Sequence, residues 1–142
     1  MSDNKVIESV EDIEQAVILP VEAYISEDYA RAERDKLWRK VWLQAGRIEE
    51  IPDVGSFITY DILDDNILIV RSDENTIKAY HNVCPHRGRR LIDTPKGAKN
   101  ATGRRKQFVC AYHGWQFNLE GENTRILHEE DWQGALTSDC NG

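Results

Sequence analysis

The sequence predicts a mostly β protein: a small antiparallel β-sandwich that follows one helix and carries two loops rich in potential metal ligands. Short stretches of alternating apolar and polar residues follow one another between residues 56 and 118, with turn residues between them. Apolar residues at helical spacing occur before the first of these stretches. The two loops, residues 84–88 and 110–115, contain two of the three cysteines and two of the four histidines.

The N-terminal region is predicted to be an arm followed by a helix. Residues 1–23 are mostly acidic and polar, with a first apolar anchor at residues 17–20, which is typical of a mobile arm that becomes ordered against a partner subunit. Ser26 suits the N-cap of a helix because acidic residues follow it and favour the positive end of the helix dipole. The apolar spacing beyond it predicts a helix over about residues 27–40.

The rest of the chain is predicted to form short antiparallel strands. The expected strands are residues 42–47, 56–62, 66–71, 76–80, 107–110 and 115–118, with turns at 64–66, 72–75 and 119–123. Residues 94–106 contain a proline, two glycines and no apolar period, so we expect an exposed loop there. The two Cys/His loops should then lie at the ends of adjoining hairpins, close enough to share one metal centre.

Length and composition limit the possible functions. A chain of 142 residues is one domain with a modest core. The longest purely aliphatic run, residues 67–70, is far shorter than the roughly 20 residues that a membrane span needs. The sequence does not begin with the basic residues and apolar segment of a secretion signal, so secretion is not expected. A net charge of −7 argues against general nucleic-acid binding. Two cysteines in the loops and an unpaired Cys140 fit a reducing cytoplasm.

The two loops repeat one arrangement of metal ligands. Residues 84–88 read Cys-Pro-His-Arg-Gly, and residues 110–115 read Cys-Ala-Tyr-His-Gly-Trp. A C-x-H pair combined with a C-x2-H pair is typical of a [2Fe–2S] cluster in which two histidines replace two cysteines on one iron. The four predicted ligands, two thiolates on a buried iron and two imidazoles on an outer iron, are Cys84, Cys110, His86 and His113.

Other uses of these four residues explain the pattern less well. Structural zinc sites place like ligands together, as C-x2–4-C and H-x3–5-H, whereas cysteine and histidine alternate here. A nucleophilic cysteine with a histidine base would leave the duplication unexplained. Four unrelated core residues would not repeat the order cysteine, histidine, glycine.

Residues 80–88 and 108–117 resemble the Rieske domain of aromatic-ring-hydroxylating oxygenases, which are Rieske non-haem iron enzymes, in the N-terminal part of the large (α) subunit. Residues 37–47 and 131–136 are similar as well, so the resemblance covers nearly the whole chain from about Tyr24. It implies a Rieske-type β-sandwich with two cluster-binding loops over residues 24–142. The 23 residues between His86 and Cys110 exceed the usual spacing of the family, and the excess falls in the expected exposed loop.

The resemblance implies electron transfer from a ferredoxin or reductase, through the cluster, to a mononuclear iron. Such an iron is usually held by two histidines and one carboxylate, and the remaining histidines, His81 and His128, do not complete that set. The chain is therefore expected to be a fragment that lacks the catalytic domain with its Fe(II), and its own status as an enzyme stays open. A stand-alone Rieske ferredoxin is the alternative, although the arm and helix favour the oxygenase. A homo-oligomer or an α/β hetero-oligomer is expected.

Several neighbouring residues allow two interpretations. Trp115 packs beside the cluster or is an ordinary core aromatic, and both can hold. His81 is interpreted as a hydrogen-bonded structural residue rather than a fifth ligand. Tyr112 either hydrogen-bonds near a ligand sulfur or is a half-buried strand residue, and His128 is interpreted as a solvated turn residue.

Positive charge gathers beside the first loop. Residues 87–106 contain eight basic residues and one acidic residue, which leaves −14 for the remainder of the chain. This basic rim either steers an acidic electron donor toward the cluster or only keeps an exposed loop soluble.

Overall fold

The computed structural model describes residues 19–135, and the chain divides into two compact units, Met1–Leu43 and Gln44–Gly142. Residues 1–18, most of the predicted arm, and Cys140 lie outside the described residues. The predicted boundary at residue 23 falls inside the first unit and stays a prediction.

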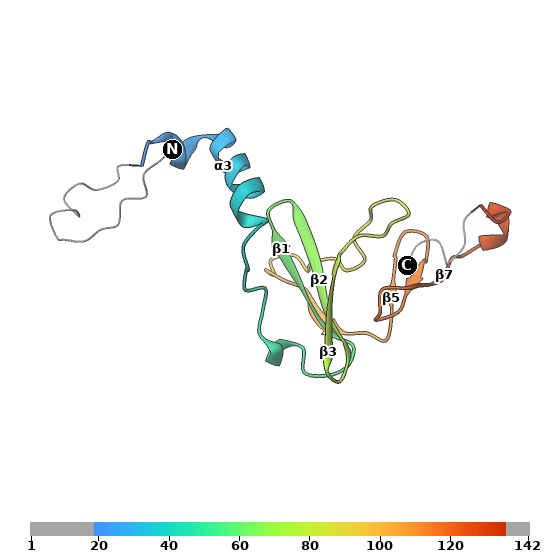
Figure 1. The fold of residues 1–142 in the computed structure, drawn as a ribbon. Coiled ribbons are helices and arrows are strands. Elements are labelled where there is room, and N and C mark those ends of the chain that lie inside the picture. The colour runs from blue at the N-terminus through green and yellow to red at the C-terminus, as the bar shows by residue number, and fades with distance from the viewer. Residues whose placement is uncertain (1–18, 136–142) are drawn as a thin grey trace. The chain divides into compact units, whose positions relative to one another are not determined.

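The first unit is mainly helical between residues 22 and 38 (Figure 1). Helix α2 is Glu22–Ile25 and helix α3 is Glu27–Glu33, and α3 continues into a π-helical turn, η1, at Arg34–Trp38. Ser26 caps α3 as predicted, since its Oγ accepts a hydrogen bond from Tyr29 N. The predicted helix therefore exists, but its last turn widens, with the Arg39 N–H bonded to the Arg34 carbonyl five residues earlier.

The strand predicted over residues 42–47 is wrong. These residues have no strand partner in the described part of the chain, and a 3₁₀ turn, η2, follows at Ile48–Glu50. Both edges of β1 are already paired, with β2 and β4, so the apolar character of this segment does not lead to sheet pairing there.

The larger sheet has four antiparallel strands in the order β3-β2-β1-β4. Its strands are β1 (Ser56–Ile62), β2 (Asp65–Asp73), β3 (Thr76–His81) and β4 (Thr102–Arg104). The first three match the prediction to within two residues at each end. Along β2 every second side chain is buried, from Asn66 to Ser72, which is the period expected of a strand with one face on the core.

Strand β4 corrects part of the prediction of an exposed loop over residues 94–106: residues 102–104 form a strand, although they are exposed as expected. Ala101 is buried, its N–H donates to Thr59 Oγ1 at 2.8 Å, and its carbonyl accepts from Thr59 N at 2.8 Å. Gly103 follows opposite Phe57, where a Cβ would lie 3.1 Å from the aromatic ring. The segment carries no strand period of its own, and its pairing with β1 depends on contacts far apart in the sequence.

The smaller sheet holds the second predicted loop. It has three antiparallel strands in the order β5-β6-β7, namely β5 (Phe108–Val109), β6 (Gln116–Phe117) and β7 (Asn123–Arg125). Strand β7 begins at Asn123, the last residue of the predicted turn at 119–123. The turn η3 (Glu129–Trp132) follows β7.

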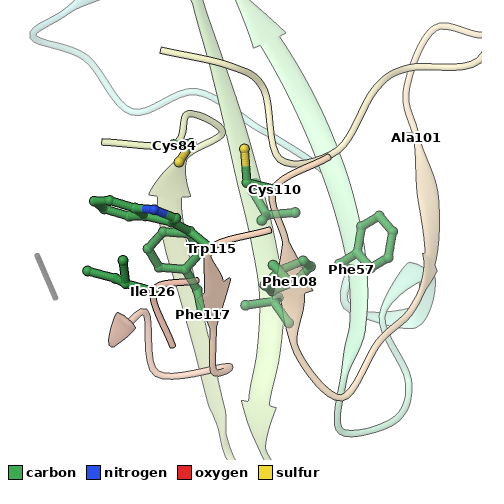
Figure 2. Packing of buried hydrophobic residues seen from close by; sticks show 10 residues of the cluster. Phe57, Cys84, Ala101, Phe108, Cys110, Trp115, Phe117 and Ile126 are labelled. Atoms are coloured by element: carbon green, nitrogen blue, oxygen red, sulfur yellow. The ribbon is translucent and has the colours of Figure 1, made fainter. Parts of the chain in front are cut away.

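One apolar core joins the two sheets (Figure 2). Phe57 of β1 and Phe108 of β5 meet edge to face, with their ring centroids 5.8 Å apart. The predicted class, a mostly β fold built from small antiparallel sheets, is confirmed. Among the described residues, no helix is both long and apolar enough to cross a membrane.

Candidate metal centre

The two predicted loops have the same backbone turn. In the first loop, residues 84–89, Cys84 N donates to the Arg89 carbonyl at 2.7 Å and Gly88 N donates to the Cys84 carbonyl at 2.9 Å. In the second loop, residues 110–115, the corresponding bonds are Cys110 N to the Trp115 carbonyl at 2.8 Å and Gly114 N to the Cys110 carbonyl at 2.9 Å. The repeat seen in the sequence is therefore a repeat of backbone conformation.

Each turn requires its glycine. Gly88 has a φ of +72° and Gly114 a φ of +68°, in the region that other residues enter only with strain.

The first loop does not lie at a hairpin end, contrary to the prediction. It follows β3, whose strand partner is β2, and the next strand along the chain is β4. The second loop does connect the two paired strands of a hairpin, β5 and β6.

The two cysteine side chains are buried next to each other. Cys84 and Cys110 are 1% and 2% exposed, and Figure 2 shows both sulfur atoms at one end of the shared core. Burial raises the pKa of the Cys84 thiol, and the neighbouring Cys110 adds to the rise. The backbone N–H groups of His86 and Arg87 donate toward the Cys84 sulfur and lower the pKa of this thiol. Contacts of this kind stabilise a metal-bound thiolate.

The two histidine rings also meet each other. The ring centroids of His86 and His113 are 4.6 Å apart, and both side chains are half-buried. Burial lowers the pKa of His86, and the charges of His113 and Arg87 lower it further, which favours the neutral form that a metal ligand needs. His113 Nδ1 is buried without a hydrogen-bond partner.

These donors fit a two-metal cluster. The side chains form a sulfur pair and a nitrogen pair, and the orphaned His113 Nδ1 is free to bind a metal. Within residues 19–135, no three His, Cys, Asp or Glu side chains converge on one metal position. A [2Fe–2S] cluster with mixed ligands would be held by the sulfur pair at one iron and by the nitrogen pair at the other.

Aromatic side chains enclose the histidine pair. Trp115 is 2% exposed and stacks on His86, with centroids 4.8 Å apart and planes within 5°. Trp115 is thus both a core residue and a neighbour of a predicted ligand. Tyr112 is 54% exposed and stacks on His113 at 3.9 Å, so it is not a half-buried strand residue.

The sequence reasoning missed two residues of the site, Trp132 and Leu127. The Trp132 ring lies edge-on to His86, with centroids 6.1 Å apart, and Leu127 packs so closely that a Cβ on Gly114 would lie 2.5 Å from its Cδ1. Residue spacing could not reveal them, since β7 separates both from the ligand loops. Only the similarity of residues 131–136 to the oxygenases pointed to this segment.

A surface hollow of about 630 Å³ opens beside the histidine pair. Its lining includes both predicted histidine ligands, Trp132, Asp131 and His128. His128 is an exposed turn residue, as interpreted, with a φ of +57°. His81 is exposed at the end of β3 and lines a different, apolar hollow.

Comparisons with known proteins agree with this geometry. Residues 41–132 match the Rieske family, described as the Rieske [2Fe-2S] domain. The oxygenase subunit of carnitine monooxygenase from Escherichia coli K12 is 29% identical over 126 residues, which are 89% of this chain and 31% of that protein. The oxygenase subunit of glycine betaine monooxygenase from Pseudomonas aeruginosa UCBPP-PA14 is 36% identical over 117 residues, 82% of this chain and 25% of that protein.

A solved structure of naphthalene 1,2-dioxygenase with indole in its active site superposes with a TM-score of 0.69 at 31% identity, covering 79% of this chain and 24% of that one. The chain thus spans a third or less of the length of these relatives. Since the family match extends over more than half of the chain, the protein belongs to the Rieske [2Fe-2S] domain family, whose members bind a [2Fe–2S] cluster, and its relatives are large subunits of Rieske oxygenases.

Proposed function

We propose that the chain transfers single electrons through a Rieske [2Fe–2S] cluster to the mononuclear iron of an oxygenase. The observation that carries this proposal is the pairing of two buried thiols with two adjoining imidazoles on matching turns. The proposed ligands are Cys84 and Cys110 on one iron and His86 and His113 on the other. When bound, the cluster takes up and releases one electron at a time.

The residues of this chain give the two ends of the site different surroundings. The sulfur end lies in the apolar core, where water is excluded. The nitrogen end lies beside the surface hollow, where the surface of another protein can approach. Electron exchange with partners is therefore expected at the histidine side.

An oxygenase subunit is favoured over a stand-alone ferredoxin because the relatives described above are oxygenase subunits that extend far beyond the matched region. The mononuclear iron would lie in a catalytic region outside this chain. We propose that the protein forms a homo-oligomer or an α/β hetero-oligomer and lies in the cytoplasm. We also propose that residues 24–142 are the Rieske domain and that residues 1–23 form an arm before it.

The relatives are named for carnitine, glycine betaine and naphthalene, so this domain does not define the substrate.

An acidic ferredoxin or reductase is the proposed donor. Arg89, Arg90 and Arg104 of the basic rim have acidic partners, Asp93, Asp61 and Asp53 respectively. Arg104, Arg105 and Lys106 line a separate hollow of about 680 Å³. If the basic rim, residues 87–106, steers the donor, the rate of reduction should fall as ionic strength rises. A rate that does not depend on ionic strength would contradict this steering.

The central experiment measures the cofactor directly. Protein reconstituted without oxygen should contain iron and acid-labile sulfide in equal amounts, two of each per chain. Its reduced form should give the EPR spectrum of a [2Fe–2S] cluster with mixed ligands. Colourless protein, or protein that retains only zinc, would refute the proposed function.

A further inference from the structure

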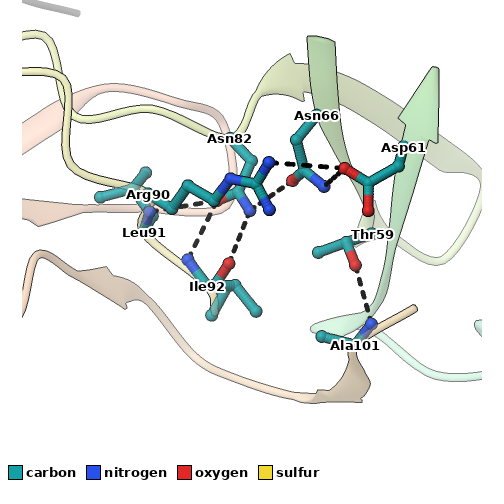
Figure 3. Close-up of polar contacts among 8 residues, drawn as sticks. All are labelled: Thr59, Asp61, Asn66, Asn82, Arg90, Leu91, Ile92 and Ala101. Carbon is teal, nitrogen blue, oxygen red and sulfur yellow. Dashed lines mark hydrogen bonds and ion pairs between the residues drawn. The ribbon is translucent and has the colours of Figure 1, made fainter. Parts of the chain in front are cut away.

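Asn82, two residues before the first predicted ligand, is buried and uses every hydrogen-bonding position of its amide (Figure 3). It is 2% exposed. Its Oδ1 accepts from Leu91 N at 3.1 Å and from Ile92 N at 2.9 Å. Its Nδ2 donates to the Ile92 carbonyl at 2.7 Å and to Asn66 Oδ1 at 2.6 Å.

These bonds close the chain around the first loop. Three of them join Asn82 to residues 91–92 and thus hold together the two ends of the segment that contains Cys84 and His86. The fourth attaches the segment to β2, and the backbone N–H of Asn82 also donates to the Asn66 carbonyl at 2.8 Å.

The contacts continue into the sheet. Asn66 Nδ2 donates to Asp61 Oδ1 at 2.7 Å, and the same carboxylate oxygen lies 3.5 Å from Arg90 at the end of the loop. Asn66 is itself buried. Asp61 and Arg90 are exposed, so the buried part of the network is the pair Asn66 and Asn82. This pair favours one conformation, because breaking its bonds leaves polar groups buried without partners.

We propose that Asn82 is a positioning residue for the cluster: its amide holds the first ligand loop in the conformation that directs Cys84 and His86 to their iron atoms. This inference rests on the proposed function. Asn82 is not one of the four predicted ligands, and it would act through the backbone at residues 91–92. Residues that orient metal ligands typically contribute about 10- to 100-fold to metal affinity.

A graded set of variants tests the inference. Asn82→Ala removes all four side-chain bonds, Asn82→Asp keeps the two that Oδ1 accepts, and Asn66→Ala removes one acceptor. Asn118→Ala is the matched control, since Asn118 Oδ1 accepts from Glu120 N at 3.0 Å and Glu122 N at 2.9 Å in a turn that holds no predicted ligand.

The first readout is the rate of cluster loss to an iron chelator, followed by absorbance. Asn82→Ala should lose the cluster about 10- to 100-fold faster than the parent protein, Asn82→Asp and Asn66→Ala should be intermediate, and Asn118→Ala should be unchanged. The second readout is the EPR spectrum and midpoint potential of the retained cluster, which should change in the Asn82 variants and not in Asn118→Ala.

The outcomes separate this inference from the proposed function. A parent protein without a [2Fe–2S] cluster refutes the proposed function. A parent protein with the cluster, and an Asn82→Ala variant that matches Asn118→Ala in both readouts, overturns the inference alone. If Asn82→Ala gives no soluble protein, parent-like values in Asn82→Asp and Asn66→Ala overturn it equally.

Discussion

The first ligand loop, residues 84–89, and the second, residues 110–115, share two backbone hydrogen bonds and a glycine with positive φ, yet they are attached to the protein differently. The second loop connects two paired strands, so the ladder between β5 and β6 holds its ends. The first loop has a strand on one side only, and the Asn82 amide joins its ends instead. One turn can thus be stabilised by strand pairing or by a single buried side chain.

The surroundings of the two glycines differ as well. A Cβ on Gly88 would meet no atom within 4 Å, whereas a Cβ on Gly114 would lie 2.5 Å from Leu127 Cδ1. The second loop is therefore packed under an apolar side chain, and the first is open at the same position. The first loop also depends on the second for cover, because Trp115 stacks on His86.

Removing a predicted ligand should have the largest effect, and the same effect in both loops. Cys84→Ala and Cys110→Ala should each abolish cluster binding, because alanine offers no lone pair to iron. Iron, sulfide and visible absorbance measure the result. Cys140→Ala, which changes the remaining cysteine of the chain, is the control and should keep a full cluster. Normal cluster content in either ligand variant would contradict the prediction that both loops supply a necessary cysteine ligand.

The two tryptophans beside His86 should differ in their contribution to stability. Trp115→Ala empties a site that is 2% exposed and should lower the free energy of unfolding by about 3–5 kcal/mol. Trp132→Ala, at a position 40% exposed, should lower it by no more than about 1.5 kcal/mol, the range of one aromatic contact. Urea unfolding of the two variants measures both. Equal losses of unfolding free energy would show that the buried Trp115, which stacks on His86 from the second loop, contributes no more stability than the exposed Trp132.

The two glycines test the difference in packing. Gly88→Ala should lower the free energy of unfolding by about 1–2 kcal/mol, because alanine must adopt a positive φ. Gly114→Ala should lose about 1–3 kcal/mol more, because its Cβ also collides with Leu127. In a protein that already carries Leu127→Ala, the loss of unfolding free energy caused by Gly114→Ala should be as small as the loss caused by Gly88→Ala. If the difference between the glycines persists in that background, the collision is not its cause.

The smallest effect concerns the contact between the strand that leads into the first loop and the segment that follows the second. Tyr80 of β3 donates its hydroxyl to the Leu119 carbonyl at 3.1 Å, so Tyr80→Phe should lower the free energy of unfolding by about 1 kcal/mol at neutral pH.

This tyrosine also predicts a dependence on alkaline pH. Burial raises the pKa of Tyr80. Above its ordinary value near 10, the unfolded chain therefore loses the proton before the folded one does, and stability falls as pH rises through that range. Tyr80→Phe should lack this part of the alkaline loss in thermal unfolding between pH 9 and 11. Parallel curves for both proteins would exclude Tyr80 as its source.

Much of the candidate site could be predicted from local sequence. The cysteines, histidines and glycines of the two loops stand within a few residues of one another, so their spacing alone shows the repeated turn. The strands β1, β2 and β3 were predictable for the same reason, since each is a short run of strand-forming residues between turn residues, and in β2 the apolar alternation matches one buried face. The expected loop was wrong only at β4, which pairs with β1 just after Ala101 bonds to Thr59, and this pairing joins distant residues.

The sequence by itself determined the fold class, the family and the four residues proposed to bind iron, because each depends on short-range patterns of side-chain chemistry. Only the tertiary structure decided what surrounds them: the Asn82 amide across the first loop, Leu127 over Gly114, and Trp132 against His86. These contacts join residues that are separated along the chain, so their geometry depends on the tertiary fold and not on any local spacing.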